Sequence, residues 1–136
     1  MPPLPIPSVL LVDDDSTANF LHALLLRTMG VARQVLVAEN GEQALHTVVQ
    51  ASVSTPAACP ALILLDLNMP VMNGLAFLEA YAQLPAPQQQ ATIILLTTSL
   101  HERDLARARE LPIAGFLEKP LTREKVTALL QQHFAA

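Results

Sequence analysis

The chain has 136 residues, of which 51% are hydrophobic and only 15% are charged, and its formal net charge is −4. This length suits one domain with a buried core, and the composition excludes both a disordered tail and a basic nucleic-acid-binding protein. Residues 43–65 carry no charge, but their polar and proline residues interrupt any apolar span long enough for a membrane, so we expect a cytoplasmic protein without membrane or nucleic-acid contacts.

Short apolar runs and proline or glycine residues divide the chain into alternating strands and helices. Residues 1–7 (MPPLPIP) lack the positive region of a signal peptide, and we expect an extended lead-in there. Uninterrupted apolar runs are typical of strands buried on both faces of a parallel sheet, and they occur at residues 9–12, 62–65 and 93–96. The weaker strand candidates are residues 35–38 and 113–117.

Segments with a helical spacing of apolar residues lie between and after these strands, at residues 17–29, 42–51, 75–84, 101–111 and 122–134. In the first of them, the apolar residues expected to face the core are Phe20, Leu21, Leu24, Leu25 and Met29. Asp15 and Thr122 are suitable N-caps for the first and last helices. Strands that alternate with helices of this length predict five β-α units with right-handed crossovers, which form a three-layer α/β sandwich over residues 1–136.

Acidic, hydroxyl and lysine side chains follow the ends of four predicted strands. In chain order they are Asp13 and Asp14, Asp66, Thr97, and Lys119. Because ligands of open α/β sheets bind beyond the carboxyl ends of the strands, we expect these side chains to converge. Converging carboxylates repel one another unless a cation intervenes, and oxygen ligands suit Mg²⁺. Asp66 then stands as a carboxylate nucleophile toward a phosphoryl group, whose charge Mg²⁺ and Lys119 would neutralise.

Four motifs at these strand ends resemble those of response-regulator receiver domains: LVDDD (11–15), LLDLNMPVMNG (64–74), ILLTTS (94–99) and GFLEKP (115–120). They occur in the same order as in that family, and the resemblance covers nearly the whole chain. It implies a flavodoxin-like fold whose parallel five-stranded sheet has the order 2-1-3-4-5. It also implies a stand-alone, chemotaxis-type receiver in two-component signalling.

The resemblance gives each matching residue a role. Asp66 matches the phosphoryl acceptor, and Thr97 and Lys119 match the hydroxyl and the lysine that assist phosphoryl transfer. Mg²⁺ would be held by three carboxylates and one backbone carbonyl, those of Asp13, Asp14, Asp66 and, for the carbonyl, Asn68. Thr97 and Phe116 match two switch positions that move after phosphorylation, and Pro120 matches a proline preceded by a cis peptide bond.

The resemblance also implies the partners of the protein. The phosphoryl group would come from the phosphohistidine of a sensor histidine kinase or a histidine phosphotransfer protein, and the receiver would catalyse only its own phosphorylation and dephosphorylation. The chain stops at Ala136, soon after the last predicted helix, so we expect its output to be a protein contact through the predicted helix at 101–111, strand at 113–117 and helix at 122–134, or a phosphorelay step. Leu121, Val126 and Phe134 indicate an apolar face for a partner or for a second copy of the chain.

A few residues depart from the family pattern or have no assigned role. Thr98 stands where receivers usually carry a small residue; it either narrows access to the phosphoryl group or is neutral, and we expect it to be neutral. Pro112 replaces the usual glycine before the fifth strand, and we expect it to alter only that turn. Asn68 and Ser99 are small and polar, which predicts a short-lived phosphoryl group because an attacking water is unobstructed. Cys59 is expected in an exposed loop. Four histidines are expected at the surface or rim, namely His22, His46, His101 and His133.

Three alternative functions fit the sequence less well. A flavodoxin-like electron carrier needs a Ser/Thr/Gly-rich phosphate loop after the first strand, where the acids at 13–15 would repel a flavin phosphate. A hydrolase of the haloacid dehalogenase type needs Asp-x-Asp, and this chain has Asn68 in place of the second acid. A degenerate receiver that acts only as an interaction module is disfavoured because all five site positions are retained.

Overall fold

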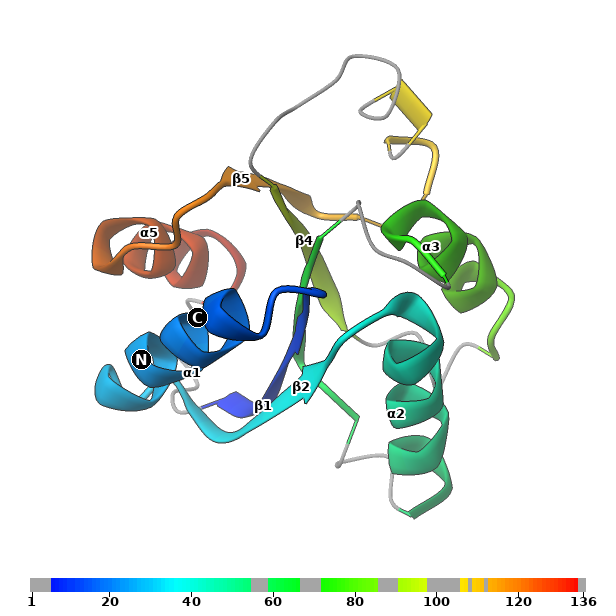
Figure 1. Ribbon diagram of the computed structural model, residues 1–136, viewed down its shortest axis with the longest axis horizontal. Helices are drawn as coiled ribbons and strands as arrows, with labels where there is room; N and C mark the ends of the chain where they lie inside the picture. The colour runs from blue at the N-terminus through cyan, green and yellow to red at the C-terminus, as the bar shows by residue number, and fades with distance from the viewer. Residues whose placement is uncertain are drawn as a thin grey trace.

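The computed structural model describes residues 6–54, 59–66, 72–85, 91–97, 106, 107, 109–111 and 113–134. Within these residues, five parallel strands form one sheet in the order β2-β1-β3-β4-β5 (Figure 1). Their bounds are Ile6–Val12 for β1, Ala32–Ala38 for β2, Leu62–Leu65 for β3, Thr92–Thr97 for β4 and Gly115–Glu118 for β5. This order confirms the predicted flavodoxin-like α/β fold.

The described helices cover both faces of the sheet. Helices α1 (Ser16–Thr28) and α5 (Arg123–His133) lie on one face, and α2 (Gly41–Ser54) and α3 (Gly74–Ala82) lie on the other (Figure 1). The predicted helix at 101–111 lies mostly outside the described residues, although residues 106, 107 and 109 are helical. None of the helices in the described part of the chain is long and apolar enough to cross a membrane.

Consecutive residues of the central strands point into opposite layers, because side chains alternate along a strand. The layer toward α2 and α3 is built on Leu10, Val12, Ile63, Leu65, Ile93 and Leu95. The layer toward α1 and α5 is built on Val9, Leu11, Leu62, Leu64, Ile94 and Leu96. The register aligns these rows, since Leu10 is paired with Leu36 and Ile63, and Ile63 is paired with Ile93. A sheet buried on both faces accounts for the apolar excess of the chain.

Helix α1 is turned differently from the prediction. Its buried residues are Asn19, His22, Ala23 and Leu26. Phe20, Leu21 and Leu24 are instead exposed, so the predicted core face is wrong at these three positions. The buried side chain of Asn19 donates a 2.7 Å hydrogen bond from Nδ2 to the backbone oxygen of Asp13, and this bond draws the polar face of α1 toward the end of β1.

The element ends follow the predicted capping residues, with small differences in length. The Asp15 carboxylate accepts hydrogen bonds from the backbone N–H groups of Thr17 and Ala18, and the Thr122 hydroxyl accepts one from that of Lys125, so both predicted N-caps are confirmed. Strand β1 begins at Ile6, so the last two residues of the predicted lead-in belong to the strand, while residues 1–5 lie outside the described residues.

Candidate phosphoryl-acceptor and metal site

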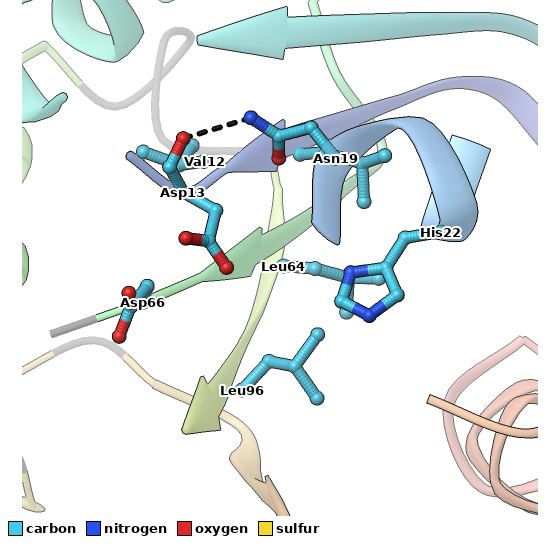
Figure 2. A pocket seen from close by; sticks show the side chains of 8 residues that line it. Val12, Asp13, Asn19, His22, Leu64, Asp66 and Leu96 are labelled. Atoms are coloured by element: carbon cyan, nitrogen blue, oxygen red, sulfur yellow. Dashed lines mark hydrogen bonds between the residues drawn. The ribbon is translucent and has the colours of Figure 1, made fainter. Parts of the chain in front are cut away.

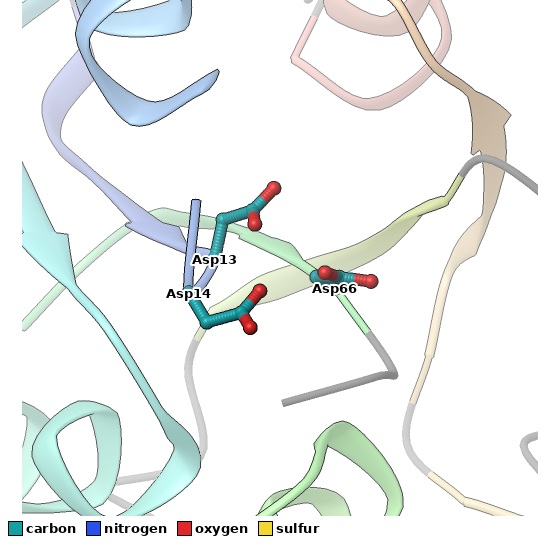
Figure 3. Close-up of side chains that lie close together, drawn as sticks. All are labelled: Asp13, Asp14 and Asp66. Atoms are coloured by element: carbon teal, nitrogen blue, oxygen red, sulfur yellow. The ribbon is translucent and has the colours of Figure 1, made fainter. Parts of the chain in front are cut away.

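Three aspartates meet at the carboxyl edge of the sheet (Figure 3). One carboxylate oxygen from each of Asp13, Asp14 and Asp66 lies within 4.8 Å of the other two. Asp13 and Asp66 are 4% and 8% exposed, whereas Asp14 is exposed. Three oxygen ligands of one charge at this spacing form a donor set that fits a hard divalent cation such as Mg²⁺.

Backbone hydrogen bonds extend the sheet as far as the two buried aspartates. The N–H of Asp13 donates to the oxygen of Ala38 at 3.1 Å, and the N–H of Asp66 donates to the oxygen of Val12 at 2.9 Å. Two residues before them, Leu11 and Leu64 face the α1 and α5 layer. Strand alternation therefore directs both carboxylates to that same side, which brings them together.

Lys119 places a positive charge beside the two buried acids. Its ammonium group forms an ion pair with Asp13, and its Nζ lies 3.7 Å from Oδ2 of Asp66. The lysine side chain is largely buried, so solvent screens these contacts less than at the surface. The peptide bond between Lys119 and Pro120 is cis, which confirms the prediction for Pro120.

Two further residues beneath the acids were missed by the sequence analysis (Figure 2). Asn19 and His22 line a small pocket together with Asp13, Asp66 and the apolar ends of three strands. The Asn19 amide holds the backbone oxygen of Asp13, while Oδ1 of Asp13 accepts a 2.9 Å hydrogen bond from the N–H of Asp15. The available signal was the spacing of Asn19, His22, Ala23 and Leu26, which places them on one helical face.

His22 is buried, so the prediction of a surface or rim position is wrong for this histidine. Burial lowers its pKa below the ordinary value of 6.5, because the charged imidazolium loses hydration, and the positive charge of Lys119 lowers the pKa further. Asp13 and Asp15 act in the opposite direction. A neutral imidazole is therefore favoured under the acidic cluster. Among the other histidines, His46 is exposed, His133 is partly buried, and His101 lies outside the described residues.

The predicted switch positions are only partly described. Thr97 ends β4 and is paired in register with Glu118, but its side chain lies outside the described part. Phe116 is half-buried against the α2 and α3 layer, and the guanidinium carbon of Arg109 lies 5.7 Å from its ring centroid. The predictions for Asn68, Thr98, Ser99 and Pro112 fall outside the described residues.

Two other surface predictions are corrected by burial. Cys59 is buried, not exposed in a loop, and packs at the start of the segment that leads into β3. Leu121 and Val126 belong to the core layer of α1 and α5, and Phe134 packs partly against it. Leu121 and Val126 therefore serve the core and do not contribute to the apolar docking face expected from the sequence, whereas Phe134 is only partly buried.

The fold and the acidic edge of the sheet are those of an open α/β domain with a candidate cation site, and comparisons with known proteins identify its family. The family model for the response regulator receiver domain matches residues 9–131. The chain is 34% identical over 129 residues to a probable chemotaxis protein CheY of Rhizobium etli, covering 94% of this chain and 92% of that protein. It is also 30% identical to two-component response regulator 24 of Arabidopsis thaliana, covering 92% and 82%.

Solved structures show the same similarity. A two-component response regulator from Cytophaga hutchinsonii superposes with a TM-score of 0.82 at 29% identity, covering 93% of this chain and 96% of that chain. The chemotaxis protein CheY4 of Vibrio cholerae gives a TM-score of 0.76 at 27% identity, covering 95% and 99%. The chain therefore belongs to the response regulator receiver domain family. Receiver domains are phosphoryl-accepting switches that bind Mg²⁺ at an acidic pocket, and the aspartate cluster is compatible with such a pocket.

Proposed function

We propose that this protein is a Mg²⁺-dependent receiver that accepts a phosphoryl group on Asp66 and acts as a conformational switch or as an intermediate in a phosphorelay. The observation that carries the proposal is the meeting of Asp13, Asp14, Asp66 and Lys119 at one edge of the sheet. The donor would be the phosphohistidine of a sensor histidine kinase or a histidine phosphotransfer protein. The protein then catalyses only its own phosphorylation and dephosphorylation.

The proposed transfer is a displacement at phosphorus. A carboxylate oxygen of Asp66 attacks the phosphorus atom, a P–O bond forms, and the P–N bond to the donor histidine breaks. The electron pair of that bond stays on the donor nitrogen. A donor ring that is protonated on its other nitrogen leaves as neutral imidazole, and an unprotonated ring becomes neutral by taking a proton from water. Lys119 lies close enough to Asp66 to pair with the phosphoryl oxygens, and its charge offsets the charge that they bring.

The metal ligands in this proposal are Asp13, Asp14, Asp66 and the backbone carbonyl of Asn68. The three carboxylates supply the hard oxygen ligands that Mg²⁺ prefers. When bound, Mg²⁺ neutralises charge on the phosphoryl group and on the carboxylates around it. Asp13 is held from several directions by backbone and side-chain hydrogen bonds, so its carboxylate is positioned before any ligand arrives.

The proposed output is a change of surface after phosphorylation. The hydroxyl of Thr97 would turn toward the phosphoryl group, and Phe116 would follow into the space that it leaves. Phe116 is only partly buried, and the Arg109 guanidinium lies over its ring, so a movement of Phe116 would also change this contact. The affected surface is the segment 101–111 together with β5 and α5, where a downstream protein would bind.

The test is incubation with Mg²⁺ and acetyl phosphate, followed by measurement of the intact mass. We expect one added phosphoryl group on the wild type, and none on Asp66→Ala or without Mg²⁺. Asp15→Ser is the matched control, because it removes a neighbouring carboxylate and retains a side chain that can cap α1. Wild type that stays unmodified and binds no beryllofluoride would overturn the proposal. The small polar residues Asn68 and Ser99 predict rapid decay of the adduct, and a lifetime of many hours would contradict that part.

A further inference from the structure

An exposed apolar patch covers the outer side of α1 and the adjoining edge of the sheet. It consists of Phe20, Leu21 and Leu24 on α1 and Val37 on β2, which are 66%, 54%, 50% and 47% exposed. We call these four residues the α1/β2 patch. Single exposed apolar residues are ordinary, but a cluster of large ones on neighbouring elements marks an interaction surface.

The residues of the α1/β2 patch are not needed to pack α1 against the sheet, because another face of the helix makes that contact. Helix α1 already buries Ala23 and Leu26 against the sheet, and Phe20 and Leu24 lie on its outer side, one turn apart. A groove between α1 and β2 adjoins the patch and is lined by residues that include Phe20, Val37, Arg27 and Glu39. Strand β2 is also the last strand at its side of the sheet, so the described residues leave this edge open.

The charges around the α1/β2 patch are divided between its two ends. In the segment 14–39, the acids are Asp14, Asp15 and Glu39, and the bases are Arg27 and Arg33. All five are exposed. The acids follow the ends of β1 and β2 at the carboxyl edge of the sheet, whereas the bases lie in the last turn of α1 and at the start of β2, at the opposite edge.

A surface that is apolar in the middle, acidic at one end and basic at the other is complementary to itself when turned by 180°. We infer that the α1/β2 patch binds the same patch of a second copy, with the two α1 helices antiparallel. In this arrangement Arg27 of each copy faces Glu39 of the other, and the apolar residues meet around the two-fold axis. A parallel arrangement would instead place like charges together.

The proposed interface must extend beyond the four side chains of the α1/β2 patch. A stable interface takes about 800 Å² from each partner, which is more than four side chains supply. In the proposed dimer the groove, Arg27 and Glu39 also belong to the interface, which runs along the 13 residues of α1, a length of about 20 Å. An alternative occupant is a helix of a phosphohistidine partner. The acidic and basic ends of the patch favour a partner whose basic end meets the acidic end and whose acidic end meets the basic end, and a second copy turned by 180° has this arrangement.

The test compares the mass in solution of wild type and variants by sedimentation over a dilution series. We expect a dimer for the wild type, and a monomer for the double variant Phe20→Ser and Leu24→Ser. Both side chains are exposed, so these changes leave the core intact. Arg27→Glu should raise the dissociation constant by about tenfold, because two ion pairs in each dimer become like-charge contacts. Arg123→Glu on the exposed side of α5 is the matched control and should leave it unchanged.

The charge reversals give the sharpest result. Arg27→Glu and Glu39→Arg should each weaken the dimer alone, while the double variant, or an equimolar mixture of the two single variants, should restore it. Monomeric wild type at the highest concentration would overturn the inference, as would a dimer that is insensitive to these substitutions. Monomeric wild type whose patch variants lose transfer from a phosphohistidine protein would assign the patch to that partner. Acetyl phosphate labelling of Asp66 tests the proposed function independently of all these outcomes.

Discussion

Replacing Asp14 with asparagine should stabilise the protein without metal and remove its stabilisation by Mg²⁺. A carboxylate oxygen of Asp14 lies within 4.8 Å of one from Asp13 and one from Asp66. At that spacing each repulsion amounts to about 1 kcal/mol in water and about 3 kcal/mol at intermediate screening. Asp14 is exposed, so the lower value applies, and the nearby charge of Lys119 offsets part of the sum. We therefore expect a gain of about 1 kcal/mol for Asp14→Asn in a chelator.

The assay is urea unfolding in EDTA and in MgCl₂. Without metal the variant should unfold at higher urea, and this advantage should shrink as salt screens the repulsion. With Mg²⁺ the order should reverse, because the wild type gains the binding free energy of the ion and the variant has lost a charged ligand. Glu124→Gln is the control, since it removes an equal charge in the first turn of α5, away from the cluster. A variant that is less stable than wild type in EDTA, or that gains equally from Mg²⁺, would refute the reasoning.

Three further changes test the surroundings of the site. Gly41→Ala should destabilise the fold by about 1–3 kcal/mol, measured by urea unfolding, because the added Cβ would lie 2.7 Å from the backbone oxygen of Met72. Asn19→Ala should lower the free energy of unfolding by about 1–3 kcal/mol, because it leaves the buried carbonyl of Asp13 without the donor of this hydrogen bond. The same variant should bind Mg²⁺ more weakly in a titration, and an unchanged affinity would show that Asn19 does not position Asp13 for the ion. For His22, whose folded pKa lies below 6.5, the unfolded chain binds more protons as the pH falls below that value, so wild-type stability in EDTA should drop there. His22→Leu should show a shallower drop, and parallel pH profiles would contradict this.

The sheet was predictable from sequence because its central strands are buried on both faces. Runs such as residues 62–65 contain no polar residue, and only a strand covered on both sides accepts such a run. The start of the edge strand was harder to predict. Strand β2 begins at Ala32, three residues before the predicted start, and the prediction missed this beginning because Arg33 and Gln34 are polar and exposed. Sheet pairing, which the sequence does not show locally, holds them in the strand.

The rotation of α1 could not be predicted from its apolar residues. The helix is rich in leucine on several sides, so hydrophobic periodicity favours more than one face. The hydrogen bond from Asn19 to Asp13 and the burial of His22 decide between these faces, and both depend on contacts with another element. The same limit explains why the acids and Lys119 were predicted but their support was not. The end of a buried strand can be located in the sequence, whereas the face of the helix that packs beneath it cannot.

The alternation of side chains along the strands divides the protein into two halves with different freedom to change. Asp13 and Asp66 point to the side of α1 and α5, so substitutions in that layer act on the floor of the site. The layer of α2 and α3 is built on the residues in between, such as Leu10 and Ile63, and only Val12 of the residues named for that layer lines the pocket beneath the acids. Engineering of stability is therefore best placed at residues of the α2 and α3 layer that do not line the pocket beneath the acids, such as Leu10 and Ile63, where gains in packing should add to the free energy of unfolding.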